Sequence, residues 1–150
     1  MKKLFIFVIL WHSLLTAGFA QDAAGEERSF KIIVNAENSE TALRTKEIAK
    51  LFLKKVKMWK QTDEPVLPVD QLETTVVRQE FSQEILRKKL TAIKAYWQKQ
   101  IFSGRGVPPP EKESDEDVLE YVDATPGAIG YIAISTEIEG YRVTVIEILE

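Results

Sequence analysis

The order of apolar patterns along the chain constrains its fold more than any other feature. Alternating or continuous apolar runs predict strands, and apolar residues three or four positions apart predict amphipathic helices. The strand-like segments are 30–36, 66–69, 128–134 and 141–149. The helix-like segments are 45–53, 74–86, 90–102 and 114–125. The expected N-caps are Thr45 for the first helix, Thr74 or Thr75 for the second, and Ser114 for the last. The resulting order, β-α-β-α-α-α-β-β, predicts an α/β fold with a small mixed sheet of about four to five strands flanked by helices.

The first 20 residues have the layout of a secretory signal peptide. Lys2 and Lys3 precede an apolar stretch that ends at Leu15, and Gly18 and Ala20 place small residues before a cut after Ala20. The alternative is a membrane anchor, but the apolar stretch is shorter than the roughly 20 residues that a spanning helix needs. No cysteine follows the cut, so a lipoprotein is not expected. The sequence therefore predicts a periplasmic protein.

The expected organisation has three parts. Residues 1–20 are the signal peptide, 21–29 a small and charged flexible leader, and 30–150 a single domain. The mature chain of 130 residues has the length of one ordinary domain.

Composition excludes several kinds of chemistry. The chain has no cysteine, and its one histidine, His12, is lost with the signal peptide. A mature chain of this kind has no Ser-His-Asp triad, no cysteine nucleophile and no histidine-based metal site. Loss of Lys2 and Lys3 changes the formal net charge from −3 to −5, which disfavours nucleic acids and anionic membrane surfaces as partners. We expect no cofactor, no metal and no membrane insertion after signal cleavage.

Three segments in order resemble a known family. They are "EIAKLFLKKVKMW", "YWQKQIFSGRGVPPP" and "VLEYVDATPGAIGYI". Together they resemble the C-terminal part of the periplasmic substrate-binding proteins of phosphate ABC transporters, and more closely their short, single-lobe relatives. The resemblance covers about residues 30–134. It implies a lobe of the type II periplasmic binding fold, whose full members hold an oxyanion with backbone amides at helix N-termini and with hydroxyl, arginine and aspartate side chains.

This chain departs from the family pattern in length and at the anion-binding turn. A mature chain of 130 residues has room for one lobe, whereas a clamp of two lobes needs about twice that length. Full phosphate binders carry a Ser-Gly-Thr type turn with a nearby arginine, and here the region reads "DQLETTVVRQEF". Glu73 places a negative charge where an anion is expected, which opposes binding.

Four residues are the candidate ligand-binding residues. Thr74 and Thr75 supply hydroxyls at the start of a helix, and Arg78 lies one turn in. The competing interpretation is a helix N-cap and a solvated arginine. Arg105, between two glycines, could contact a ligand or partner, or could simply suit the end of the preceding helix.

Other polar and aromatic clusters have structural explanations. The acidic runs 63–64 and 115–117 lack EF-hand spacing and suit turns and helix starts. Trp97 shares an apolar helix face with Ile93 and Ile101, so core packing explains it better than a ligand platform. Gly127 is expected to turn the chain after a helix, and Gly130 to allow close packing in a strand.

Three classes of function follow. The first is a non-enzymatic exported protein that binds phosphate or a related oxyanion, weakly or together with a partner. The second is an interaction module that keeps the lobe without its own ligand and binds a transporter or envelope protein, or forms a homodimer. An enzyme is the weakest, because no spacing of carboxylates, lysines or hydroxyls assembles a catalytic group.

Overall fold

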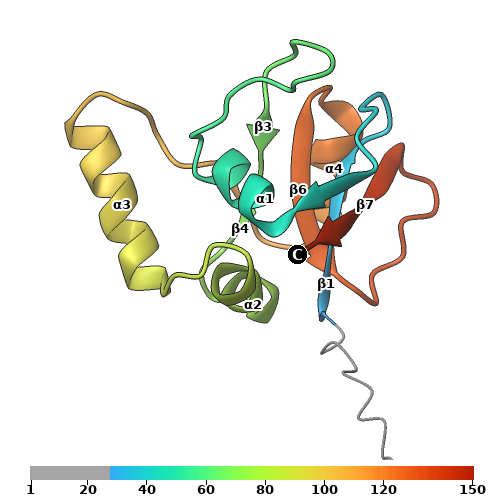
Figure 1. Cartoon of the computed structure of the whole chain (residues 1–150). Helices are drawn as coiled ribbons and strands as arrows, with labels where there is room; N and C mark the ends of the chain where they lie inside the picture. The colour runs from blue at the N-terminus through green and yellow to red at the C-terminus, as the bar shows by residue number, and fades with distance from the viewer. Residues whose placement is uncertain (1–27) are drawn as a thin grey trace, which may run out of the picture.

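A computed structural model describes residues 28–150. The expected signal peptide and most of the expected leader lie outside the described residues. A five-stranded sheet forms the centre, with strands in the order β2-β7-β1-β6-β3, and four helices surround it (Figure 1). A second sheet contains β4 and β5. The expectation of an α/β lobe with a small mixed sheet is confirmed.

The elements match the predicted segments closely. The strands are β1 (Phe30–Asn35), β2 (Ala42–Arg44), β3 (Leu67–Pro68), β4 (Asp70–Gln71), β5 (Glu111–Lys112), β6 (Ala128–Ala133) and β7 (Val143–Leu149). The helices are α1 (Thr45–Phe52), α2 (Val76–Glu84), α3 (Leu90–Phe102) and α4 (Asp115–Ala124). The predicted order missed β2, β4 and β5, because two or three residues are too few to show an alternating pattern.

Strand β1 is the centre of the sheet and pairs antiparallel with both β6 and β7. Strands β2 and β3 form the two edges and run parallel to their neighbours. Pro68 lies in β3, where the outer side of the strand has no ladder partner to lose, as expected for proline at an edge. The two strands that close the sequence therefore flank its first strand, and this pairing ties both ends of the domain together.

Alternate side chains of the central strands enter two cores. On one face, Ile32 of β1 and Tyr131 of β6 pack with residues of α1, α2 and α3. On the other face, Ile33 of β1 and Ile132 of β6 pack against α4. All four of these side chains are fully buried, and this burial is the main favourable term in holding the layers together.

Two glycines have the structural roles expected from the sequence. Gly127 has a φ of 76°, and an added Cβ would lie 2.3 Å from the carbonyl oxygen of Pro65. Its own carbonyl accepts hydrogen bonds from the Trp59 indole at 2.9 Å and from Leu67 N–H at 3.0 Å. At Gly130, an added Cβ would lie 2.7 Å from Val118 of α4. The missing side chain of Gly130 lets α4 approach the sheet.

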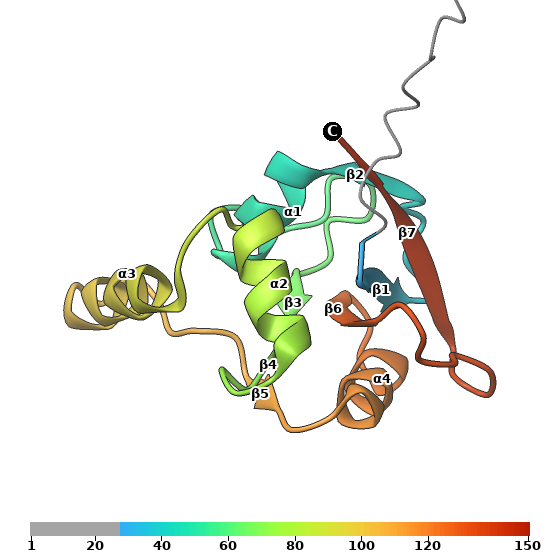
Figure 2. The ribbon, with the colours of Figure 1, turned by 90° about the horizontal axis from the view of Figure 1, so that it is seen from below.

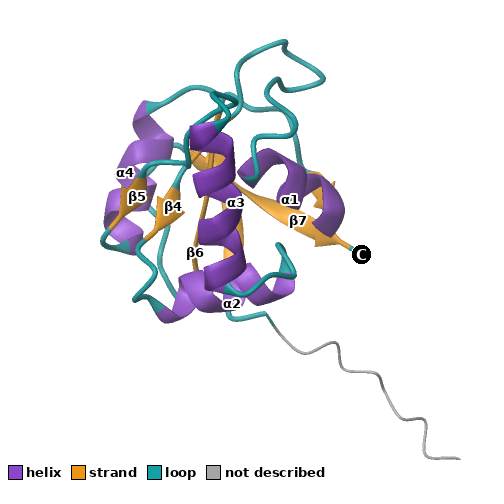
Figure 3. Ribbon diagram, turned by 90° about the vertical axis from the view of Figure 1, so that its left-hand side faces the viewer, coloured by secondary structure: helices purple, strands orange, loops and turns teal. Residues whose placement is uncertain are grey.

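Helix α3 stands apart from the rest of the domain. It projects to one side of the sheet in the view from below (Figure 2), and it lies in front of the sheet when that side faces the viewer (Figure 3). Its buried residues are Ile93 and Trp97, and the Tyr96 hydroxyl donates to the Leu53 carbonyl at 2.8 Å. The expected core packing of Trp97 is confirmed, whereas Ile101 on the same apolar face is 50% exposed. The C-terminal end of α3 therefore extends beyond the part of the domain that buries Ile93 and Trp97.

The helix starts agree with the sequence at two of three positions. The Ser114 hydroxyl accepts from Asp117 N–H at 3.1 Å and caps α4 as predicted. Thr75 caps α2. For α1 the prediction of Thr45 as N-cap was wrong: Arg44 occupies that position, and the Glu47 carboxylate accepts from Arg44 N–H at 3.1 Å.

Candidate functional site

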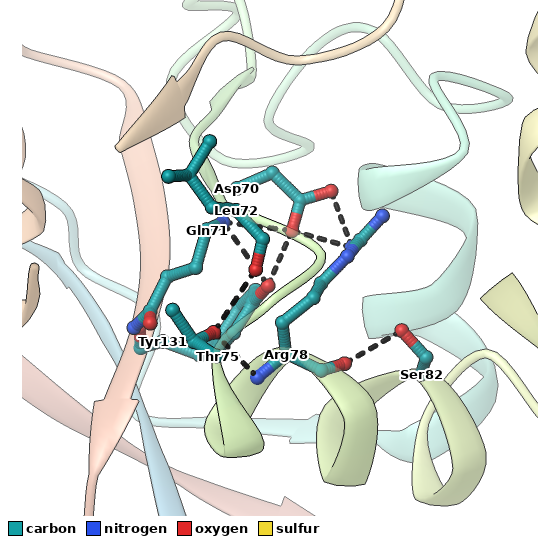
Figure 4. A network of polar contacts seen from close by, with 7 residues as sticks. All are labelled: Asp70, Gln71, Leu72, Thr75, Arg78, Ser82 and Tyr131. Atoms are coloured by element: carbon teal, nitrogen blue, oxygen red, sulfur yellow. Dashed lines mark hydrogen bonds and ion pairs between the residues drawn. The ribbon is translucent and has the colours of Figure 1, made fainter. Parts of the chain in front are cut away.

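A polar network lies where β4 leads into α2, next to strand β6 (Figure 4). Its centre is the Asp70 carboxylate, which accepts hydrogen bonds from Arg78 Nη1, from the Tyr131 hydroxyl and from Gln71 N–H. Strand β4 supplies Asp70, helix α2 supplies Arg78, and β6 supplies Tyr131. Three separate elements therefore converge on one carboxylate.

Helix α2 starts in a way that places Arg78 in this network. The Thr75 hydroxyl accepts from Arg78 N–H at 3.2 Å and donates to the Leu72 carbonyl at 3.1 Å. The Ser82 hydroxyl donates to the Arg78 carbonyl at 2.7 Å one turn later. These bonds fix the first turn of α2, and the arginine side chain extends from it toward Asp70 (Figure 4).

Arg78 and Asp70 form a buried ion pair. The exposed fraction of the Arg78 side chain is 4% and that of Asp70 is 6%. Among residues 28–150, Arg78 Nε is buried without a hydrogen-bond partner. A buried ion pair gains less than its Coulomb attraction because both groups lose water. The pair retains one arginine donor that no group of the described chain uses.

Aromatic packing holds Tyr131 in place. The Tyr131 ring stacks on Phe81 of α2, with 3.9 Å between centroids and 5° between planes. Gln71 N–H also donates to the Tyr131 hydroxyl at 3.2 Å, and Gln71 Nε2 donates to the Tyr131 carbonyl at 3.0 Å. The tyrosine therefore links the apolar core to the buried charges.

The buried position changes the proton affinity of both acids. Burial raises the pKa of Asp70, and the neighbouring Arg78 guanidinium and the donated hydrogen bonds oppose that shift. Burial also raises the pKa of Tyr131 well above its ordinary value, and the adjacent Asp70 carboxylate adds to this rise. Tyr131 is consequently a neutral hydrogen-bond donor at physiological pH.

A cleft of about 200 Å³ lies between this network and α3. We call it the α3 cleft. Its lining residues are Asp70, Glu73, Arg78, Ile93, Lys94, Trp97, Gln98, Ile101, Pro108 and Glu111. Three of these carry a carboxylate and two carry a cation. The wall formed by α3 is cationic and apolar, and the opposite wall is mostly acidic.

The four predicted site residues have different environments. Thr74 is exposed, Thr75 is the N-cap, and Arg78 is buried, so these three share the start of α2. The alternative interpretation of Arg78 as a solvated arginine was wrong. Arg105 is exposed in the loop after α3 and does not line the α3 cleft with Arg78. The structure brings three of the four together.

Asp70 is the residue that the sequence did not predict. Its only sequence signal is an acidic residue next to the apolar run 66–69, eight positions before an arginine on an amphipathic helix. That spacing does not identify an ion pair, because the turn between β4 and α2 decides whether the two side chains meet. The predicted opposition of Glu73 remains relevant, since Glu73 lines the α3 cleft.

Residues 28–150 show neither a metal site nor a spanning helix. No group of three or more metal-ligating side chains occurs in this part of the chain. None of its helices is long and apolar enough to cross a membrane.

Comparison with solved structures identifies the fold. A Clostridium perfringens protein assigned as a phosphate ABC transporter substrate-binding protein, with bound phosphate, superposes with a TM-score of 0.61 at 19% identity. An ABC-type phosphate transport receptor from Vibrio cholerae gives 0.59 at 18%, and PstS from Borrelia burgdorferi gives 0.63 at 15%. Each comparison covers 80% of this chain but only 44%, 46% and 47% of the other chain, respectively. The chain thus spans less than half of these proteins, as expected for one lobe.

Sequence comparison places the chain in a family. No curated protein is similar enough in sequence to count as a match. The family model described as a PBP superfamily domain matches residues 29–148, which is nearly the whole described chain. This is a family of binding proteins rather than enzymes. The chain therefore belongs to the PBP superfamily domain family, and its fold is a single lobe like those of phosphate ABC transporter substrate-binding proteins.

Proposed function

We propose that this protein is an exported, non-enzymatic binding lobe that takes up phosphate or a related oxyanion at the start of α2. The observation that carries the proposal is the buried guanidinium of Arg78, whose Nε has no partner among residues 28–150 and which lines the α3 cleft. A buried donor without a partner costs free energy, and an anion that accepted a hydrogen bond from Nε would remove that cost.

The start of α2 supplies the other groups that an oxyanion needs. The first N–H groups of a helix have no partner within the helix, and the helix dipole favours negative charge there. Thr74 adds an exposed hydroxyl, whereas the hydroxyl of Thr75 is already committed to capping. The Arg78 side chain, in the first turn of α2, provides a charge-assisted hydrogen-bond donor. These groups come from one short stretch of chain, residues 74–78.

Asp70 favours an anion that carries a proton. An ionised carboxylate only accepts hydrogen bonds, so it repels a fully ionised anion and can accept from the O–H of a protonated one. Phosphate keeps a proton near neutral pH, and sulfate does not. We therefore expect the lobe to prefer phosphate over sulfate.

Weak affinity is expected for the isolated lobe. Asp70, Glu73 and Glu111 outnumber the two cations, Arg78 and Lys94, around the α3 cleft. Unit charges 4 Å apart interact by about 4 kcal/mol at an effective dielectric constant of about 20. One carboxylate without a paired cation therefore weakens anion binding substantially. We expect a dissociation constant of about 1 mM, which corresponds to about 4 kcal/mol of binding free energy.

Export belongs to the same proposal. The basic start and apolar stretch of residues 1–20, with the expected cut after Ala20, support secretion into the periplasm. These residues lie outside the described part of the chain. Sequencing the N-terminus of the protein recovered from periplasm tests the cut site, and a start at Met1 would contradict export by this signal.

Isothermal titration with phosphate and with sulfate tests the binding proposal. We expect heat with phosphate, less with sulfate, and none for Arg78→Lys, which keeps the charge but loses the planar fork. Arg105→Lys is the matched control and is expected to bind like the unmodified protein. Absence of phosphate heat at about 10 mM, ten times the expected dissociation constant, would overturn the proposal.

An interaction module is the second candidate, and the Arg78–Asp70 ion pair favours it. Because Asp70 already neutralises Arg78, the lobe can keep its fold without any ligand. On this account the lobe would bind a transporter or envelope protein. Phosphate titration separates the candidates, because only the first predicts heat that depends on Arg78.

A further inference from the structure

The far end of α3 carries an apolar surface. Ile101 is 50% exposed, Phe102 is 90% exposed, and Val107 in the following loop is 61% exposed. We call these three residues the α3 tip. Single exposed apolar residues are ordinary on protein surfaces, but three within seven positions, one of them an almost bare phenylalanine, indicate a contact surface.

The α3 tip is continuous with the α3 cleft. Ile101 belongs to the tip and also lines the cleft, together with Pro108 directly after Val107. Residues 103–110 connect the far end of α3 to β5 (Figure 1), and Val107 of the tip lies next to the cleft-lining Pro108 in this connection. A partner seated on the tip would therefore also reach the mouth of the cleft.

The charges beside the tip are arranged in opposed groups. Lys94 and Lys99 are exposed on α3, and Arg105 is exposed in the loop after it. On the opposite wall of the α3 cleft, Glu73 and Glu111 are exposed. In a two-fold dimer the same patch faces itself in reverse. The cationic α3 of each copy would then face the acidic wall of the other, which is electrostatically favourable.

We propose that a second copy of this chain docks on the α3 tip with two-fold symmetry and covers the α3 cleft. The inference rests on the proposed function, because it names the partner that completes that oxyanion site. Cations of the partner's α3 would offset Glu73 and Glu111, which oppose an anion in the single lobe.

Light scattering and sedimentation of the purified protein test the docking. We expect a dimer that Phe102→Asp dissociates, with at least about a hundredfold weaker association, as for loss of a central apolar anchor. Phe102 is almost fully exposed, so the variant should keep its circular dichroism spectrum. Ile134→Asp, at a 49% exposed apolar residue in the loop after β6, is the matched control and should remain dimeric. A monomer at all concentrations, or a dimer that Phe102→Asp leaves intact, would overturn the inference.

A charge exchange tests the two-fold arrangement. Lys94→Glu and Glu111→Lys should each weaken dimerisation by about tenfold, equivalent to about 1.4 kcal/mol, and the double variant should recover most of the loss. Higher salt should weaken the dimer of the unmodified protein. If neither single variant changes dimerisation, or if the double variant dimerises more weakly than either single variant, then α3 of one copy does not face the acidic wall of the other.

Phosphate titration of the same variants separates the two proposals. If Phe102→Asp binds phosphate as tightly as the unmodified protein, the partner does not complete the site and the inference is overturned. A loss of phosphate affinity with the loss of the dimer supports it. If no variant gives phosphate heat, the proposed function fails, and a dimer that Phe102→Asp dissociates still supports the docking.

Discussion

The two walls of the α3 cleft are held in very different ways. On the wall formed by β4 and α2, Asp70 and Arg78 are buried, and Asp70 accepts a hydrogen bond from Tyr131 of strand β6. On the opposite wall, α3 is attached through the buried Ile93 and Trp97 and projects from the body (Figure 2). The first wall is part of the core, and the second is a helix that contacts the core mainly through two buried side chains.

The two walls therefore suit different tasks: the first holds a buried ion pair in place, and the second presents a contact surface. A buried ion pair needs well-packed surroundings, because movement of one partner leaves the other as an uncompensated buried charge, which costs several kcal/mol. A contact surface needs exposed apolar area and tolerates local motion. The polar network is held by hydrogen bonds to Tyr131 of the sheet. The α3 tip lies at the exposed end of a helix, where a partner can contact it.

The largest effect should come from breaking the ion pair. Arg78→Leu leaves Asp70 buried without its cation, and we expect a loss of about 3–5 kcal/mol in the free energy of unfolding. Urea denaturation measures it. Arg105→Leu, on the exposed loop, is the matched control and should change stability by no more than about 0.5 kcal/mol. A similar small change for both variants would show that the rigid wall does not depend on the pair.

A smaller and local effect is expected for α3. Trp97→Ala removes one of two buried anchors of this helix, which costs about 3 kcal/mol for a large-to-small change. We expect this cost to appear as local release of α3, with amide hydrogen exchange in 90–102 about a hundredfold faster. Exchange in β1 and β6 should change little. If the sheet amides accelerate equally, α3 is an integral part of the core and the contrast between the walls is wrong.

Tyr131→Phe should have a moderate and pH-dependent effect. Loss of the hydroxyl that donates to Asp70 is expected to cost about 1–3 kcal/mol near neutral pH. The pKa of Tyr131 is raised in the folded state, whereas the unfolded tyrosine ionises near pH 10. The contribution of Tyr131 is therefore present below about pH 10 and is lost as pH rises above it.

The measurement is chemical denaturation of both proteins from about pH 7 to pH 11, across the tyrosine range. The stability of the unmodified protein should fall more steeply at alkaline pH than that of Tyr131→Phe, so the two curves converge. Parallel curves throughout would place the Tyr131 hydroxyl outside the buried network.

The smallest expected effect distinguishes the two threonines at the start of α2. Thr75→Ala removes the N-cap and should cost about 1 kcal/mol. Thr74→Ala, its exposed neighbour, should cost no more than about 0.5 kcal/mol but should weaken phosphate binding. Thermal unfolding with and without phosphate measures both. If Thr74→Ala leaves phosphate binding unchanged, the exposed hydroxyl is not a ligand group.

The main elements were predictable because each has a local signal. The bounds of α3 follow from its apolar spacing and from the glycines and prolines after it, and Ser114 identifies the start of α4. The short strands β4 and β5 were not predictable, since pairing between distant segments creates them. The exposure of Ile101 was missed because a helical pattern shows which face is apolar and not how far the body beneath it extends.

The candidate site was predictable only in part. The start of α2 and Arg78 follow from local sequence, because capping and helical spacing are local. The partnership of Asp70 with Arg78 and Tyr131 joins positions up to 61 apart, and no pattern within one segment encodes it. The sequence indicated Arg78 as the cation of the candidate site without showing that the Asp70 carboxylate neutralises it.

The most direct test of the account follows individual backbone amides by NMR while phosphate is added, with sulfate as the matched anion. We expect phosphate to shift the amide signals of residues 74–78 at the start of α2, sulfate to shift them less, and Arg78→Lys to abolish the response. Phosphate-induced shifts that are absent from the start of α2, or equal shifts with both anions, would contradict the claim that this lobe binds an oxyanion at Arg78.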